Sequence, residues 1–320
     1  MTASRPTQRC SIPLSAFLGF LLLCTFLLFS RDVIPWIQNG VILCGKTIIP
    51  TLFPCMIACD MLISGLGERK KGNPLLDSVT NFLFGVPGIG MSAFFLGALC
   101  GFPIGTKIAA DLYKSKRITQ RELGNLLAFS NNTGPAFLIA GVGGTLFGSL
   151  QIGVYLYIIQ LISAILCGIL FSLFSHSGAT TTHNMPVQQE AREYSFVASV
   201  ERSVMNALTV SGFVLIFSAV CGILSSFLQN SNLLAFIYAF LEVGGACAEA
   251  ARLISSAPIT SLLCACVAVN FGGLSVHLQA ASFLRDVPYS FARYISAKLT
   301  QTAIALLLTI LTIRLFLFFS

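Results

Sequence analysis

Long apolar runs alternate with short polar segments along almost the whole chain. Several runs exceed the roughly 20 residues that a helix needs to span a bilayer, and none shows the strict alternation of a membrane β-barrel strand. We therefore predict an all-α polytopic membrane protein. The runs cover about residues 12–30, 33–64, 89–113, 119–149, 152–174, 204–228, 233–254, 258–284 and 289–319.

Two of these runs are too short and too interrupted to be simple spans. The run at 89–113 contains Gly101, Pro103 and Gly105 near its middle, and the run at 233–254 carries a Gly-Gly pair. A pair of short helices joined by a Gly/Pro turn can fold back within the membrane when protein surrounds it. We predict that both runs are re-entrant hairpins, making seven crossings plus two hairpins in all.

Two further runs, 119–149 and 258–284, are broken by amides and glycines in apolar surroundings. Thr119 followed by Glu122 predicts a capping box at the start of the first one. The ends of half-helices expose N–H and C=O groups that can receive a polar solute, and Asn can both donate and accept hydrogen bonds. We predict one membrane-embedded site where the hairpin turns and the breaks meet. Its candidate substrate-binding residues are Gly101, Pro103, Gly105, Asn131, Asn132, Thr133, Gly134, Asn270, Gly272, Gly273, Ser275 and Gln279. The alternative is that these amides only satisfy backbone groups freed by the breaks.

A polar segment at 176–200 divides the chain into halves with the same order of runs: long span, hairpin, broken span, intact span. We predict an N-terminal span at 1–32, a first repeat at 33–175, a cytoplasmic linker at 176–200 and a second repeat at 201–320.

The net charge of +7 is explained by membrane topology. Most Lys and Arg lie in the short segments between runs, where the positive-inside rule predicts them. No nucleic-acid partner is expected. The distribution predicts an N-terminus inside, a first hairpin that enters from the cytoplasm and a second that enters from outside. Two like units in opposite orientation form the inverted-topology repeat of secondary transporters.

Three titratable residues near the second hairpin and break, Glu242, Glu249 and His277, are candidates for holding a Na⁺ or H⁺ coupling ion. The alternative for the carboxylates is a helix-end pair with Arg252. The alternative for His277 is a buried, hydrogen-bonded side chain.

No catalytic or metal-binding pattern is present in the sequence. The eleven Cys include no Cys-x-x-Cys pair and no His at ligand spacing, and there is neither a nucleophile elbow nor a Walker-type loop. We expect no cofactor, no metal site and no enzymatic activity.

Three motifs, Gly101–Tyr113, Leu126–Pro135 and Phe271–Gln279, resemble the sporulation integral membrane protein YlbJ family. That family belongs to a wider nucleoside-recognition or Gate-domain group, which includes the spore maturation proteins A and B. The resemblance implies a bacterial cytoplasmic-membrane protein that acts in spore cortex formation, with a core similar to that of concentrative nucleoside transporters. The hairpin turns here lack the Gly-Gln-Thr-Glu-type signature of those transporters, so the substrate stays open.

Three functions follow as hypotheses. The favoured one is a Gate-domain permease for a small polar solute such as a nucleoside. The alternative is a membrane scaffold that assembles with other sporulation membrane proteins, using small-residue faces such as Gly141–Gly148. An intramembrane enzyme is the least favoured of the three, because no nucleophile and base are paired.

Overall fold

A computed structural model describes residues 14–66, 74–175, 196–228 and 231–319. Every regular element within these ranges is helical, as the sequence predicted. The predicted linker lies outside the described residues up to residue 195.

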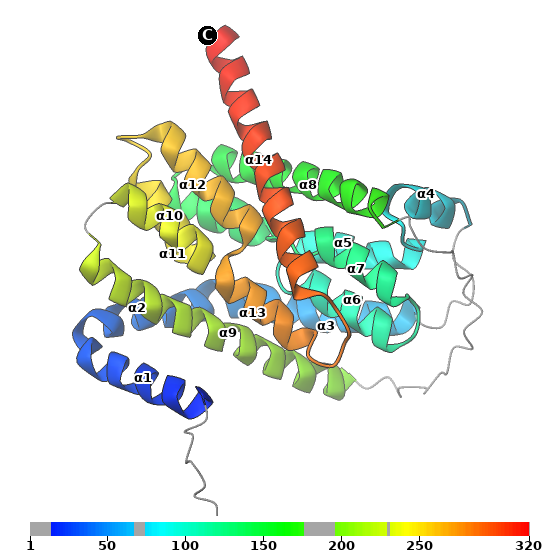
Figure 1. Ribbon diagram of the computed structural model, residues 1–320, viewed down its shortest axis with the longest axis horizontal. Coiled ribbons are helices and arrows are strands. Elements are labelled where there is room, and N and C mark those ends of the chain that lie inside the picture. The colour runs from blue at the N-terminus through cyan, green and yellow to red at the C-terminus, as the bar shows by residue number, and fades with distance from the viewer. Residues whose placement is uncertain (1–13, 67–73, 176–195, 229–230, 320) are drawn as a thin grey trace, which may run out of the picture.

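The first half of the chain begins with a helix that the rest of the fold leaves to one side (Figure 1). This helix, α1, meets α2 at a bend of 100°. The elements are α1 (Leu14–Leu28), α2 (Ser30–Leu43), the π-helical stretch η1 (Cys44–Ile48), α3 (Ile49–Leu66), α4 (Pro74–Phe84), the 3₁₀ turn η2 (Gly88–Gly90), α5 (Met91–Cys100), α6 (Ile104–Lys114), α7 (Gln120–Phe129), the π-helical stretch η3 (Ala136–Leu146) and α8 (Leu150–Leu173). The capping box is confirmed, since Thr119 and Glu122 cap α7 reciprocally.

The second half has a long helix, paired short helices, a broken helix and a long helix in that order, without a counterpart of α4 and η2. Its elements are α9 (Phe196–Phe227), α10 (Ser231–Leu241), α11 (Val243–Arg252), α12 (Pro258–Phe271), α13 (Gly273–Phe283) and α14 (Phe291–Phe319). In each half the two short helices, α5 with α6 and α10 with α11, pack against each other. That these pairs re-enter the membrane from opposite sides stays a prediction.

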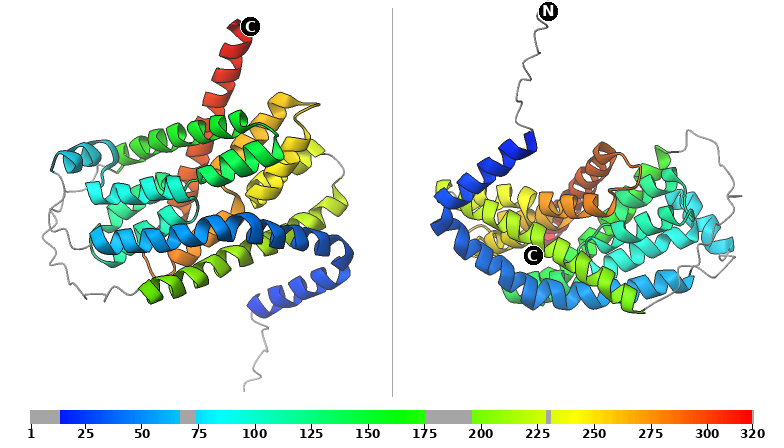
Figure 2. Two further views of the ribbon diagram at one scale, coloured as in Figure 1. Left: turned by 180° about the vertical axis from the view of Figure 1, so that it is seen from behind. Right: turned by 90° about the horizontal axis from the view of Figure 1, so that it is seen from below.

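The two halves interlock along their long helices. The helices α2 and α3 pack along α9, and α8 packs on α14 (Figures 1 and 2). Both long pairs join one half to the other, and α7 and α12 also contact α14. The breaks in α7–η3 and α12–α13 are thereby held between the halves.

Four helices in the described part of the chain are long and apolar enough to cross a membrane: Leu150–Leu173, Phe196–Phe227, Pro258–Phe283 and Phe291–Leu315. The number rises to six if each of two bent helix pairs is one span. Leu, Ile, Phe and Val side chains on the outer faces are widely exposed, as a lipid environment allows. The chain is therefore a multi-pass membrane protein.

Candidate functional site

The first hairpin closes on the first break by direct backbone contact. A Cβ added at Gly105 would lie 1.9 Å from the carbonyl oxygen of Ser130, and one at Gly97 would lie 2.3 Å from the same oxygen. The turn between the helices holds Gly101 at a φ of 88°, and Gly134 packs on its backbone. These glycines therefore let the backbone of the hairpin approach the backbone of the break more closely than any side chain would permit.

The second hairpin closes on the second break in a similar way. Gly272 and Gly273 both have positive φ, and a Cβ at Gly273 would lie 2.9 Å from the carbonyl carbon of Leu241. The turn between α10 and α11 falls at Glu242, so the expectation of a turn at the Gly-Gly pair is wrong. Those two glycines are the second and third residues of α11, the positions whose N–H groups an N-cap side chain can reach.

Glu242 is the capping residue. Its side chain is buried and accepts hydrogen bonds from the backbone nitrogens of Gly244, at 2.9 Å, and Gly245, at 2.5 Å. Both carboxylate oxygens thus accept a hydrogen bond at the N-terminus of α11, where the helix dipole favours negative charge.

Replacing Glu242 with alanine is expected to destabilise the protein by about 2–4 kcal/mol, because two buried N–H groups lose their acceptor. Glu242→Gln keeps one amide oxygen and should lose less. Thermal unfolding of the purified variants in detergent measures the difference. Equal stability of both variants and the wild type would show that the cap contributes little.

A network of polar side chains lies behind the first break, on the side of α14. The Asn131 amide nitrogen donates to the Tyr294 hydroxyl at 2.9 Å, and His277 Nδ1 lies 3.3 Å from the same hydroxyl. Lys298 Nζ donates to the main-chain oxygen of Asn131 and, at 2.7 Å, to Gln301 Oε1. Gln301 in turn donates to Asn132 Oδ1 at 3.0 Å.

The same network joins the two breaks. Thr133 Oγ1 donates to the main-chain oxygen of Val269 at 3.1 Å, and Gln160 Nε2 donates to the main-chain oxygen of Thr133 at 2.9 Å. One helical turn further along α8, Ser163 Oγ donates to Asn270 Oδ1 at 3.0 Å. The predicted Asn residues are therefore brought together, but each has an internal partner.

Some buried polar atoms in this region have no partner. Among the described residues these include Asn131 Oδ1, Ser130 Oγ, His277 Nε2 and Thr106 Oγ1. All four residues are at most 1% exposed. A cluster of unsatisfied groups is costly in a packed interior, and it marks this region as able to take further polar contacts.

A cavity of about 100 Å³ lies beside the first break, and the side chains of the polar network on α14 do not line it. It is lined by the turns of both hairpins (Gly101, Phe102, Glu242, Val243), by the first break (Thr133, Gly134), by α13 (Ser275, Val276, Gln279), and by apolar residues of α3 and α9. Five of the twelve predicted substrate-binding residues line it: Gly101, Thr133, Gly134, Ser275 and Gln279. At about 30 Å³ per water, it holds a few waters or a small solute.

The three candidate coupling-ion residues do not form one cluster. Glu242 lines the cavity but caps α11, while Glu249 forms an ion pair of 2.6 Å with Arg252. His277 belongs to the Tyr294 network on the other side of the break. In the described part of the chain, no group of three or more His, Cys, Asp or Glu could hold a metal ion.

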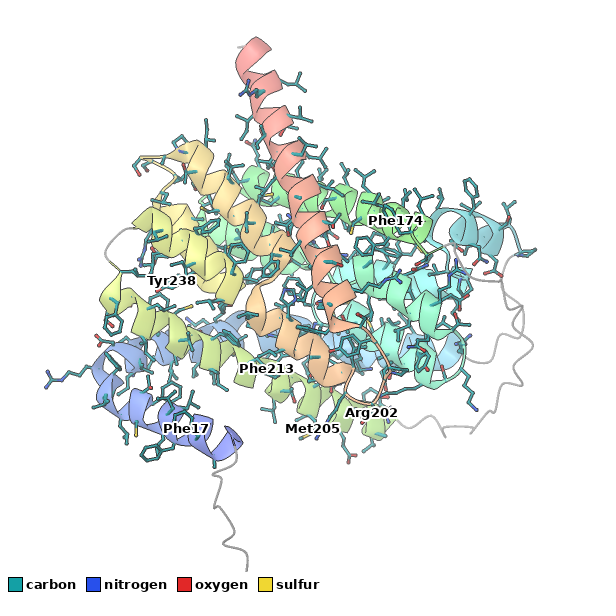
Figure 3. The ribbon with its side chains drawn as sticks, viewed as in Figure 1. Phe17, Phe174, Arg202, Met205, Phe213 and Tyr238 are labelled. Carbon is teal, nitrogen blue, oxygen red and sulfur yellow. The ribbon has the colours of Figure 1, made fainter. Side chains whose placement is uncertain are left out.

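A second, more polar cavity of about 430 Å³ lies at one end of α9, where Figure 3 shows Arg202 and Met205. An ion-pair network borders it. Asp60 on α3 contacts Arg202 of α9 at 2.6 Å and Lys107 of α6 at 3.3 Å, and Lys107 also contacts Asp111 at 3.0 Å. Asp60 further accepts from Ser199 at 2.7 Å. One carboxylate therefore connects the two halves.

Sequence reasoning missed the residues that α8 and α14 contribute, because both helices read as intact spans. The spacing of Tyr294, Lys298 and Gln301 was the available signal, since positions i, i+4 and i+7 share one helix face. A lysine in the middle of an apolar run marks such a face as inward-pointing.

Comparisons with known proteins agree with the membrane architecture. No family model and no solved structure matches the chain. The chain is similar to a curated protein, the sporulation integral membrane protein YlbJ of Bacillus subtilis (strain 168), with 24% identity over an alignment of 300 residues. The alignment covers 82% of this chain and 73% of the relative. This similarity over most of both chains supports the placement of the chain in the sporulation integral membrane protein YlbJ family.

Proposed function

We propose that the protein is a permease of the spore-forming cell that moves a small polar solute across the cytoplasmic membrane. The observation that carries the proposal is the composition of the 100 Å³ cavity, which is lined by both hairpin turns, by the first break and by α13. A site between two like halves is what alternating access requires, because each half can then open on one side. The role in sporulation rests on the similarity to the Bacillus subtilis protein.

The two cavities follow one another along the same helices. On α9 the nearest lining residues of the two cavities are Val210 and Asn206, and on α13 they are Gln279 and Ser282. At 1.5 Å per residue these steps correspond to roughly 6 Å and 5 Å along the helix axes. The larger cavity lies toward the helix ends that precede or follow basic segments, which predicts the cytoplasmic side. The Asp60 network is then a closed inner gate between the solute cavity and the cytoplasm.

A nucleoside is larger than this cavity in its present state. Ligand sites for molecules of that size usually enclose about 300–1,000 Å³. Movement of one hairpin tip away from its break would enlarge the cavity, since the tips supply a large part of its lining. In this state the cavity therefore fits a small polar solute, and larger solutes would bind only after a hairpin tip moves.

The test is solute binding followed by transport. Thermal unfolding of the purified protein is measured across nucleosides, organic acids and salts, because a ligand that binds only the folded state raises its stability. Solutes that stabilise the protein are then tested for uptake into proteoliposomes. Gln279→Ala should weaken binding and uptake roughly tenfold, through loss of a polar contact in the cavity.

Gln120→Ala is the matched control, because Gln120 is an exposed residue at the start of α7 and lines neither cavity. It should bind and transport as the wild type does. A protein that binds none of the solutes, but captures a stoichiometric partner from sporulating membranes, would contradict the permease and favour the scaffold hypothesis.

A further inference from the structure

Lys298 is a buried cation whose partners are all uncharged. Its side chain is 1% exposed, and Nζ contacts the main-chain oxygen of Asn131 and the amide oxygen of Gln301. None of the ion pairs within 4.0 Å in the described ranges involves Lys298. Buried charges normally pair with an opposite charge, so the arrangement needs another source of stabilisation.

That source is the end of a half-helix. The helix α7 ends at Phe129, and the Asn131 carbonyl follows two residues later. The carboxyl end of a helix carries partial negative charge, which buried inside a membrane protein attracts a cation. In discontinuous membrane helices, such ends and the adjoining unwound carbonyls are the groups that coordinate Na⁺.

We propose that the Lys298 ammonium is a built-in cation, occupying the position at which an alkali-metal ion would otherwise hold the end of α7. The two oxygen atoms that contact it, a main-chain carbonyl and an amide oxygen, are of the kind that a monovalent cation prefers. Asn131 Oδ1 and Ser130 Oγ, which lie close to that carbonyl in the chain, have no hydrogen-bond partner. The inference goes beyond the permease proposal and does not depend on it, because it concerns how the break is held.

The inference predicts a specific chemical rescue. Removing the ammonium with Lys298→Ala leaves the Asn131 and Gln301 oxygens without their donor, and should lower the unfolding temperature by on the order of 5 °C or more in choline chloride. Replacing choline with Na⁺ or K⁺, at a matched ionic strength of about 0.15 M, should recover a large part of that loss. The gain from Na⁺ or K⁺ over choline should be larger in Lys298→Ala than in the wild type.

Lys46→Ala is the control, because Lys46 is exposed on η1, and it should match the wild type in every salt. If Lys298→Ala does not fold, Lys298→Gln provides the same comparison with one amide donor retained. A gain from Na⁺ or K⁺ over choline that is equal in Lys298→Ala and the wild type would overturn the inference, since the ions would then act at a position unrelated to Lys298. Folded Lys298 variants with equal stability in all three salts would overturn it as well.

Discussion

Replacing Gly105 with alanine is expected to destabilise the protein by about 3 kcal/mol or more. The new Cβ would lie 1.9 Å from the Ser130 carbonyl oxygen and 3.0 Å from that of Ala93. Both neighbours are backbone atoms, so the clash can be relieved only by moving the hairpin away from the break. Thermal unfolding in detergent and the yield of folded protein in membranes measure the effect.

Gly212→Ala is the matched control for this prediction. Gly212 lies in the interior of α9, and nothing lies within 4 Å of the position of its added Cβ. Alanine is favoured over glycine in a helix by roughly 1 kcal/mol, so this variant should equal or exceed the wild type in stability. Equal behaviour of Gly105→Ala and Gly212→Ala would show that the hairpin does not close on the break as described.

Removing the Asp60 carboxylate is expected to affect both stability and the closure of the predicted inner gate. Asp60→Asn removes the carboxylate that pairs with Lys107 and Arg202, and keeps an oxygen that can accept from Ser199. Breaking a fully buried ion pair costs about 3–5 kcal/mol. Because the Arg202 side chain is 46% exposed, we expect a smaller loss of about 1–3 kcal/mol.

Asp111→Asn is the comparison, since Asp111 lies beside the same Lys107 but is 32% exposed in its side chain. It should destabilise less than Asp60→Asn, because Lys107 then keeps Asp60. If the network is an inner gate, Asp60→Asn should also raise the reactivity of groups that line the 100 Å³ cavity toward water-soluble reagents added from the cytoplasmic side. Equal reactivity in both variants and the wild type would contradict the gate.

The sequence alone determined the membrane class, the positions of the paired short helices and the two breaks. Each of these depends on local sequence alone. A run of apolar residues long enough to span a membrane can be identified without knowing what packs against it, and so can a capping box or a Gly/Pro interruption. Thr119 and Glu122 show this directly, since the helix begins where their pattern predicts. The turn at Glu242 shows the limit of such local prediction. A glycine pair suggests a turn, but here Glu242 caps the helix and the two glycines lie inside it.

Only the tertiary structure decided which polar residues face the cavity and which are satisfied inside the protein. The sequence predicted that Asn131, Asn132 and Asn270 bind a substrate at the breaks. Side chains on α8 and α14 instead supply hydrogen-bond partners for all three. Those partners lie up to 169 residues away in the chain, so no local pattern reveals them. The need of a buried polar group for a hydrogen bond is a property of its residue type, but the identity of the partner depends on which helices pack together.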